Sequence, residues 1–247
     1  MPVYDPSRYN EIPARELLDA AALGFIGVDR RLVESLLSRG PEAAADVIAF
    51  SKSENEAHRI DIAQLVVDLL RHWKPEGALD VYIDVIRRDP EEVGDELIEA
   101  LLPFREQAVE PLLELYEELG EEAGSDIAFL LAGLHVRDPR ILALLLDRLQ
   151  YDTADGAFCL GLYGDIAAKP ALEKMAAEVA ETPAAIEDDD DSTELLRELR
   201  YAIEQLGGPE PDYTPSPVRY FQRVSEDRHP RPRSADRRGT CRDAGLP

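Results

Sequence analysis

The sequence predicts an all-α protein, a solenoid in which about six helical pairs follow one another along the chain. Three observations indicate this class. The 247 residues are 45% hydrophobic but only 6% aromatic, so the core must consist mostly of Ala and Leu, which suits close helix packing. Apolar residues recur at helical spacing, and strand-like alternation is nearly absent. The helix openings recur about every thirty residues, the length of two helices and two turns.

The first forty residues differ from the rest of the chain. Residues 1–12 are polar and Tyr-rich, and we expect them to be only partly ordered. After Pro13, the segment ARELLDAAALGFIG predicts a helix, and Asp29 is placed to cap a second helix over RRLVESLLSRG. We interpret 13–40 as an atypical terminal pair, because the end repeat of a solenoid must cover an exposed apolar face.

Residues 41–207 carry the regular repeats. The outer helices are expected to open at Pro41-Glu42, Pro75-Glu76, Glu106-Gln107, Asp138-Pro139 and Asp165-Ile166. The inner helices are predicted over 57–73, 92–104, 122–133, 153–163 and 192–206. The acidic run at 181–191 is interpreted as a solvated loop, after which Ser192 or Thr193 is expected to cap the last helix.

The stretch from Asp126 to Met175 resembles a known family. In the pattern of that family, Leu-Gly-x-x-Gly-Asp ends an inner helix, and Pro with apolar residues opens the next outer helix. The matching residues are Leu160, Gly161, Gly164, Asp165, Pro170, Ala171 and Leu172. On these residues the chain is similar to HEAT-repeat proteins of the PBS lyase HEAT-like group. The resemblance implies a right-handed α-solenoid of HEAT-like hairpins and carries over no catalytic residue.

The charge of the chain predicts the kind of partner. The formal net charge is −24, and residues 208–247 hold eight Arg against six acids, which leaves about −26 for the rest. Such a body repels phosphate and anionic lipid, so we expect neither nucleic acid nor membrane as a partner, and a basic protein segment is favoured.

The Pro/Arg-rich tail 208–247 is predicted to be disordered. Its basic part, 228–242, is either a terminus without a role or a tethered partner of the acidic body.

No motif for a cofactor, a metal or catalysis is present in the sequence. Cys159 and Cys241 lack metal-ligand spacing, no His is followed by Glu, and neither a P-loop nor GxGxxG occurs. Without a long apolar run or a signal peptide, a cytoplasmic location is expected. The sequence therefore favours a non-enzymatic interaction module or scaffold. The alternative is an accessory lyase or other enzyme of the phycobilisome-lyase HEAT type.

An acid recurs near the start of the inner helices, at Asp61, Asp95, Asp126 and Asp155, in register to within one residue. One interpretation is compensation of the helix dipole, which contributes about 0.3–1 kcal/mol per acid. The other is a binding surface: the acids form a row, or ladder, on the concave inner side of the solenoid, with neighbouring carboxylates about 10 Å apart, and this row binds a basic segment. HEAT inner helices commonly carry an Arg near this position, and its absence in register predicts uncompensated negative charge. Further polar residues extend the surface, so the candidate partner-binding residues are Asp61, Gln64, Asp68, His72, Asp95, Glu99, Asp126 and Asp155.

Overall fold

A computed structural model describes residues 4–53, 62–90, 95–181 and 190–208 of the chain. In these ranges it contains twelve α-helices and no strand, which confirms the predicted all-α class there. All described residues belong to one compact unit. The tail beyond residue 208 and most of the acidic run at 181–191 lie outside the described ranges, and the predicted division of the chain at residues 13, 41 and 208 stays a prediction.

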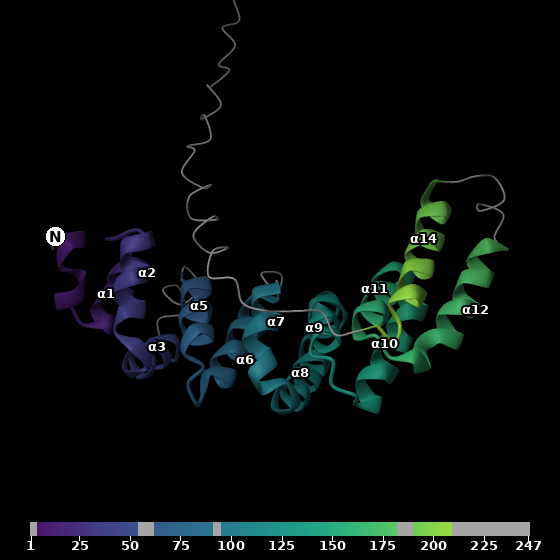
Figure 1. Ribbon diagram of the computed structural model, residues 1–247, viewed down its shortest axis with the longest axis horizontal. Coiled ribbons are helices and arrows are strands. Elements are labelled where there is room, and N and C mark those ends of the chain that lie inside the picture. The colour runs from purple at the N-terminus through teal and green to yellow at the C-terminus, as the bar shows by residue number, and fades with distance from the viewer. Residues whose placement is uncertain (1–3, 54–61, 91–94, 182–189, 209–247) are drawn as a thin grey trace, which may run out of the picture. The chain divides into compact units, whose positions relative to one another are not determined.

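The α-helices follow one another in chain order (Figure 1), and the described ranges also contain four short 3-10 helices, one before α1 and three between later helices. They are η1 (Pro6–Glu11), α1 (Ala14–Ala22), α2 (Arg30–Ser38), η2 (Gly40–Ala43), α3 (Ala44–Ser51), α5 (Ala63–Trp73), α6 (Ala78–Arg88), α7 (Asp95–Leu101), η4 (Leu102–Phe104), α8 (Arg105–Leu119), α9 (Glu121–Gly133), α10 (Pro139–Tyr151), α11 (Thr153–Tyr163), η5 (Ile166–Ala168), α12 (Lys169–Ala180) and α14 (Asp190–Gln205).

The helix ends show how well local sequence signals fix the elements. Asp29 caps α2 as predicted, because its side chain accepts a hydrogen bond of 3.0 Å from the N–H of Leu32. The last helix is different: α14 begins at Asp190, so Ser192 and Thr193 lie inside it and neither caps it. Carboxylates are favourable near the positive end of the helix dipole, which is consistent with a start inside the acidic run.

The N-terminal segment is fixed to the second helix by hydrogen bonds. Tyr9 of η1 is buried. Arg39, which follows α2, donates from Nη2 to the carbonyl oxygens of Tyr9 and Ile12 at 2.7 and 2.5 Å. The Tyr9 carbonyl also accepts from the Ile12 N–H at 3.2 Å, so the arginine adds a second bond there and ties the end of η1 to the end of α2.

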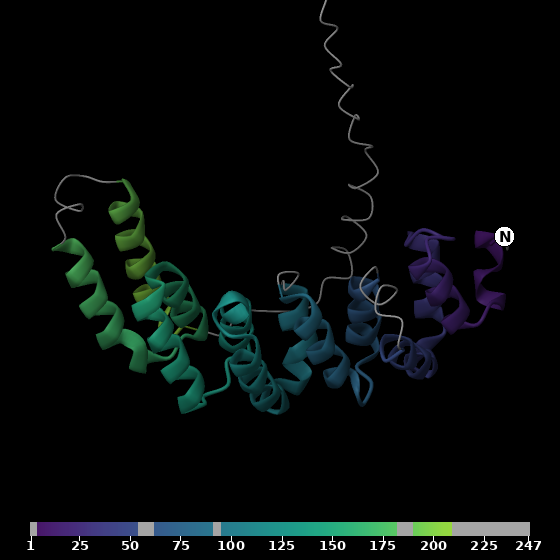
Figure 2. The ribbon, with the colours of Figure 1, turned by 180° about the vertical axis from the view of Figure 1, so that it is seen from behind.

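Helices pack mainly on their near neighbours in the sequence. In the series α5, α7, α9, α11 and α14, each helix contacts the next, and each of α7, α9 and α11 also contacts the helix that precedes it. Helices α9 and α11 lie side by side in both views (Figures 1 and 2). Buried Leu, Ile, Val and Ala side chains fill these contacts, together with a few rings such as Tyr82 and Tyr163.

Two glycines set the position of α11 between its neighbours. A Cβ added to Gly156 would lie 2.4 Å from Cα of Leu149 in α10, and one added to Gly161 would lie 3.0 Å from Cα of Ala202 in α14. Both sites therefore allow backbones to approach more closely than a side chain would permit. The relative placement of α10, α11 and α14 shapes the cavity described below.

None of the helices in the described ranges combines the length and the apolar content that a bilayer-spanning helix needs.

Candidate interaction site

Seven of the eight predicted partner-binding residues lie on four successive helices of the contacting series. Gln64, Asp68 and His72 belong to α5, Asp95 and Glu99 to α7, Asp126 to α9 and Asp155 to α11. Asp61 is outside the described residues, as is the side chain of Asp95. Asp126 is half-buried, whereas Gln64 and His72 are exposed.

One arginine links an acidic residue of α5 to an acidic residue of α7. Arg71 Nη2 lies 3.0 Å from Asp68 Oδ1, and Arg71 Nη1 donates to Glu99 Oε2. The two acidic side chains are only 10% and 8% exposed. The negative charge of Asp68 and Glu99 is compensated, because Arg71, one helical turn after Asp68, faces both carboxylates.

Asp155 is also committed to contacts within the fold. Its Oδ2 accepts from Arg148 Nε of α10 at 2.6 Å, and its Oδ1 accepts from Ser125 Oγ of α9 at 2.6 Å. Burial acts to lower the pKa of Arg148, but its hydrogen bonds to Asp155 and Tyr116 outweigh burial, and the pKa lies above its ordinary value. Asp155 therefore links three helices, and its carboxylate is not a freely available rung of a ladder.

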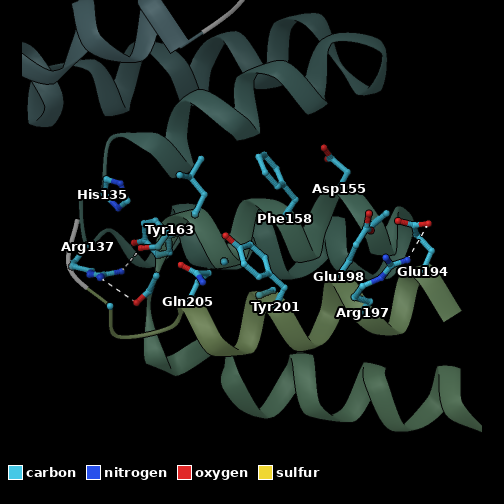
Figure 3. A pocket seen from close by; sticks show the side chains of 16 residues that line it. His135, Arg137, Asp155, Phe158, Tyr163, Glu194, Arg197, Glu198, Tyr201 and Gln205 are labelled. Carbon is cyan, nitrogen blue, oxygen red and sulfur yellow. Dashed lines mark hydrogen bonds and ion pairs between the residues drawn. The ribbon is translucent and has the colours of Figure 1, made fainter. Parts of the chain in front are cut away.

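A cavity of about 740 Å³ opens between α11 and α14 (Figure 3). Phe158 of α11 and Tyr201 of α14 face it, and their side chains are 56% and 61% exposed. Asp155, Leu162 and Glu198 also line it. Large apolar side chains left this exposed around a concave surface are typical of a binding site.

An aromatic residue follows an acid by three positions in each of α9, α11 and α14. The pairs are Asp126 and Phe129, Asp155 and Phe158, and Glu198 and Tyr201. This spacing places both side chains on one face of a helix. The rings of Phe129 and Phe158 stack across α9 and α11, with centroids 6.0 Å apart and planes at 21°. Two of these acids, Asp126 and Asp155, belong to the recurring set near the starts of the inner helices, whereas Glu198 lies in the middle of α14.

Most charged groups around the cavity have partners inside the protein. Arg197 Nη2 lies 3.2 Å from Glu194 Oε2, and Asp155 is held by Arg148. Glu198 is exposed and has no ion-pair partner among the residues that the structure describes. Its carboxylate is thus available to a ligand that enters the cavity.

The opposite end of the cavity is fixed by Arg137 and Tyr163. The Arg137 guanidinium lies over the Tyr163 ring, 5.0 Å from its centroid, and Nη1 donates to the Tyr163 carbonyl oxygen at 2.8 Å (Figure 3). The Tyr163 hydroxyl donates to the Val136 carbonyl oxygen at 2.8 Å, and burial raises the pKa of this hydroxyl. The end formed by Phe158, Tyr201 and Glu198 is therefore the part with free binding groups.

The cysteine that follows Phe158 in α11 is shielded from solvent. Cys159 is buried, and burial raises the pKa of its thiol, which keeps it protonated at neutral pH. No cluster of three or more His, Cys, Asp or Glu side chains suited to a metal ion occurs in the described part of the chain. What the cavity offers is two ring faces and a carboxylate, which bind apolar or cationic groups.

Comparisons of the chain with protein-family models, with curated proteins and with solved structures found no match.

Proposed function

We propose that the chain is a non-enzymatic interaction module or scaffold that binds a basic protein segment. The observation that carries this proposal is the cavity between α11 and α14 in a chain of net charge −24. It joins two exposed aromatic rings to the carboxylate of Glu198, which has no ion-pair partner in the described part of the chain. Aromatic anchors in a concave surface supply affinity, and a field of one sign selects partners of the other sign.

The proposed architecture is a right-handed HEAT-like solenoid. Support comes from the contacts of α5, α7, α9, α11 and α14, each with the next in the series, which is the pattern that stacked helical hairpins produce. The Leu-Gly-x-x-Gly-Asp motif adds support, because Gly164 ends α11 with a positive φ of 68° and Asp165 caps the following turn by accepting from the N–H of Ala167.

The proposed contact residues differ from those that the sequence suggested. Asp68, Glu99 and Asp155 are held by Arg71 or Arg148, so they contribute to the field of the protein rather than bind directly. Phe158, Tyr201 and Glu198 take over the contact role, which they fit through exposure and position.

The net charge acts at longer range than these contacts. A protein of this charge attracts basic segments and repels nucleic acid and anionic membranes, over a screening distance of about 8 Å at physiological salt. A cytoplasmic location, where the chain meets other proteins, is part of the proposal.

We also propose that the basic part of the tail competes with the basic partner segment for binding to the acidic body of the chain. Residues 228–242 lie outside the described residues, and their role stays a prediction. Changing Arg231, Arg233, Arg237 and Arg238 together to Gln in the full-length chain tests it. Competition predicts tighter binding of an added basic peptide, and unchanged binding at low salt would contradict it.

A pigment-binding or lyase role of the phycobilisome HEAT type is the second candidate. The volume of the cavity favours it, since about 740 Å³ lies within the range of small-molecule sites. Titration of the protein with an open-chain tetrapyrrole, followed by absorbance, tests this role. Saturable binding that Phe158→Ala abolishes would support it, and the absence of any spectral change would oppose it.

Binding of a fluorescent peptide with four Arg-Gly-Ser repeats tests the main proposal. Its matched control carries citrulline, a neutral residue of nearly the same shape, in place of each Arg. We expect the Arg peptide to bind and its affinity to fall by about tenfold or more between about 50 and 300 mM salt. Equal affinity for the citrulline peptide, or no binding of either, would exclude charge-directed capture of a basic segment.

A further inference from the structure

The cavity between α11 and α14 also indicates which group of a partner it receives. We propose that it takes one arginine side chain, with the apolar stem and the guanidinium plane against Phe158 and Tyr201 and the charge at Glu198. This inference rests on the proposed function and goes further, because it names the anchoring residue of the bound segment.

The two rings belong to helices in direct contact. Phe158 of α11 and Tyr201 of α14 face the same cavity (Figure 3), and the close approach of Gly161 to Ala202 fixes the two helices against each other. One face of the Phe158 ring is covered by Phe129, but Phe158 and Tyr201 both remain more than half exposed. The exposed parts of the two rings are open to a ligand without any change in the packing of the helices. A flat cation with an apolar stem suits such a surface.

The charge around the rings selects a cation. Glu198 precedes Tyr201 by three residues and shares its helix face. Asp155 and Glu194 already have Arg148 and Arg197 as partners, so Glu198 is the carboxylate in this group that a ligand can use without breaking an ion pair. A guanidinium matches a carboxylate with two parallel hydrogen bonds, which an ammonium group does not do.

The protein itself places guanidinium groups on aromatic rings. Arg137 lies over Tyr163, another wall of the same cavity, at 5.0 Å, and Arg15 lies over Phe50 at 5.2 Å. The arrangement proposed for the ligand thus already occurs at two other rings of this protein.

Arg197 provides a substitution that should strengthen arginine binding rather than weaken it. It lines the cavity next to Glu198, and its ion pair with Glu194 is largely exposed, so it repels an incoming arginine while being only weakly held. Arg197→Gln removes this repulsion and also frees Glu194. The inference therefore predicts that Glu198→Gln weakens binding and Arg197→Gln strengthens it.

The experiment uses the full-length protein and short capped peptides Gly-Ser-X-Ser-Gly, in which X is Arg, Lys, citrulline or norleucine. Binding is followed by NMR of protein with labelled Phe and Tyr rings. We expect the Arg peptide to bind best, Lys next and the two neutral peptides least, with contacts between arginine methylene protons and the rings of Phe158 and Tyr201. Glu198→Gln and Tyr201→Leu should each weaken Arg binding about 3- to 10-fold.

Glu117→Gln in α8 is the matched control, because Glu117 is also an exposed helical Glu but does not line this cavity. Equal effects of Glu198→Gln and Glu117→Gln, or equal binding of the Arg and citrulline peptides, would overturn the inference. If the four-Arg peptide binds with the expected salt dependence but the ring contacts arise elsewhere, only this inference fails. If the four-Arg peptide does not bind at all, the proposed function fails with it.

Discussion

Arg148 and Asp155 form an ion pair that joins the last turn of α10 to the first turn of α11. The Nε and Oδ2 atoms lie 2.6 Å apart, and the side chains are 8% and 21% exposed. Ser125 of α9 donates to the other oxygen of the same carboxylate. The recurring acid of the inner helices thus has, in this repeat, a role in holding three helices together.

The first prediction concerns the stability that this pair provides. Asp155→Asn should lower the free energy of unfolding by about 1–3 kcal/mol, because Arg148 stays buried and loses its charged acceptor. Chemical denaturation followed by circular dichroism measures the change. Asp147→Asn, at an exposed position of α10, should have an effect under about 0.5 kcal/mol. Equal effects of the two substitutions would show that the pair contributes nothing.

The second prediction concerns the close contact of α10 with α11. A Cβ on Gly156 would meet backbone atoms of Leu149 at 2.4 Å, so Gly156→Ala must separate the helices and should cost about 1–3 kcal/mol or more. Gly27→Ala serves as control, because nothing lies within 4 Å of its added Cβ. Thermal melting of both variants measures the difference. A Gly156→Ala variant as stable as wild type would contradict the described packing.

The third prediction is a pH dependence at the start of α10. Asp138 caps this helix and is bonded by the N–H and the guanidinium of Arg140, and these bonds hold the pKa of the carboxyl below its ordinary value. A lowered folded-state pKa means that the charged form favours folding. The stability that the Asp138 carboxylate adds to the folded state is fully present above the ordinary pKa of 3.8. It is lost as the pH falls through the lowered pKa of the folded state.

Asp138→Asn isolates this charge, because Asn also caps helices well. The variant should be less stable than wild type by about 0.3–1 kcal/mol at pH 6. The difference should shrink toward zero below about pH 3. Denaturation at both pH values measures it, and a difference that stays constant or grows in acid would contradict the assignment.

The fourth prediction concerns the thiol of Cys159. Because this side chain is buried and its pKa is raised, it should react with a thiol reagent at pH 8 about 100-fold more slowly in the native protein than in denaturant. A Cys241→Ser background leaves Cys159 as the only thiol. Full labelling of the native protein within minutes would show that the α11 contacts open readily.

The sequence predicted the helices well because their signals are local. The inner helix expected over 153–163 has these bounds as α11, and Asp29 caps α2 as expected. The start of α14 was missed, because an acidic run in a helical first turn and the same run in a loop look alike in sequence.

The candidate site was harder to predict, because it depends on which helix faces meet. Arg71 and Glu99 are 28 residues apart on two helices, and Arg148 belongs to a different helix from Asp155, so neither pair follows from the residue spacing within one helix. The positions of Phe158 and Tyr201 were visible in the sequence. Their exposure was not, since the same spacing also describes rings buried in a helical core.

The most direct test of the account is the mapping of a basic peptide on the isotopically labelled full-length protein by amide chemical shifts. Titration with the four-repeat Arg-Gly-Ser peptide should perturb α11 and α14 around Phe158 and Tyr201. The shifts should decrease as salt rises from about 50 to 300 mM. Perturbations confined to the exposed face of α5 at Gln64 and His72, or none at all, would contradict the claim that the cavity between α11 and α14 captures a basic segment.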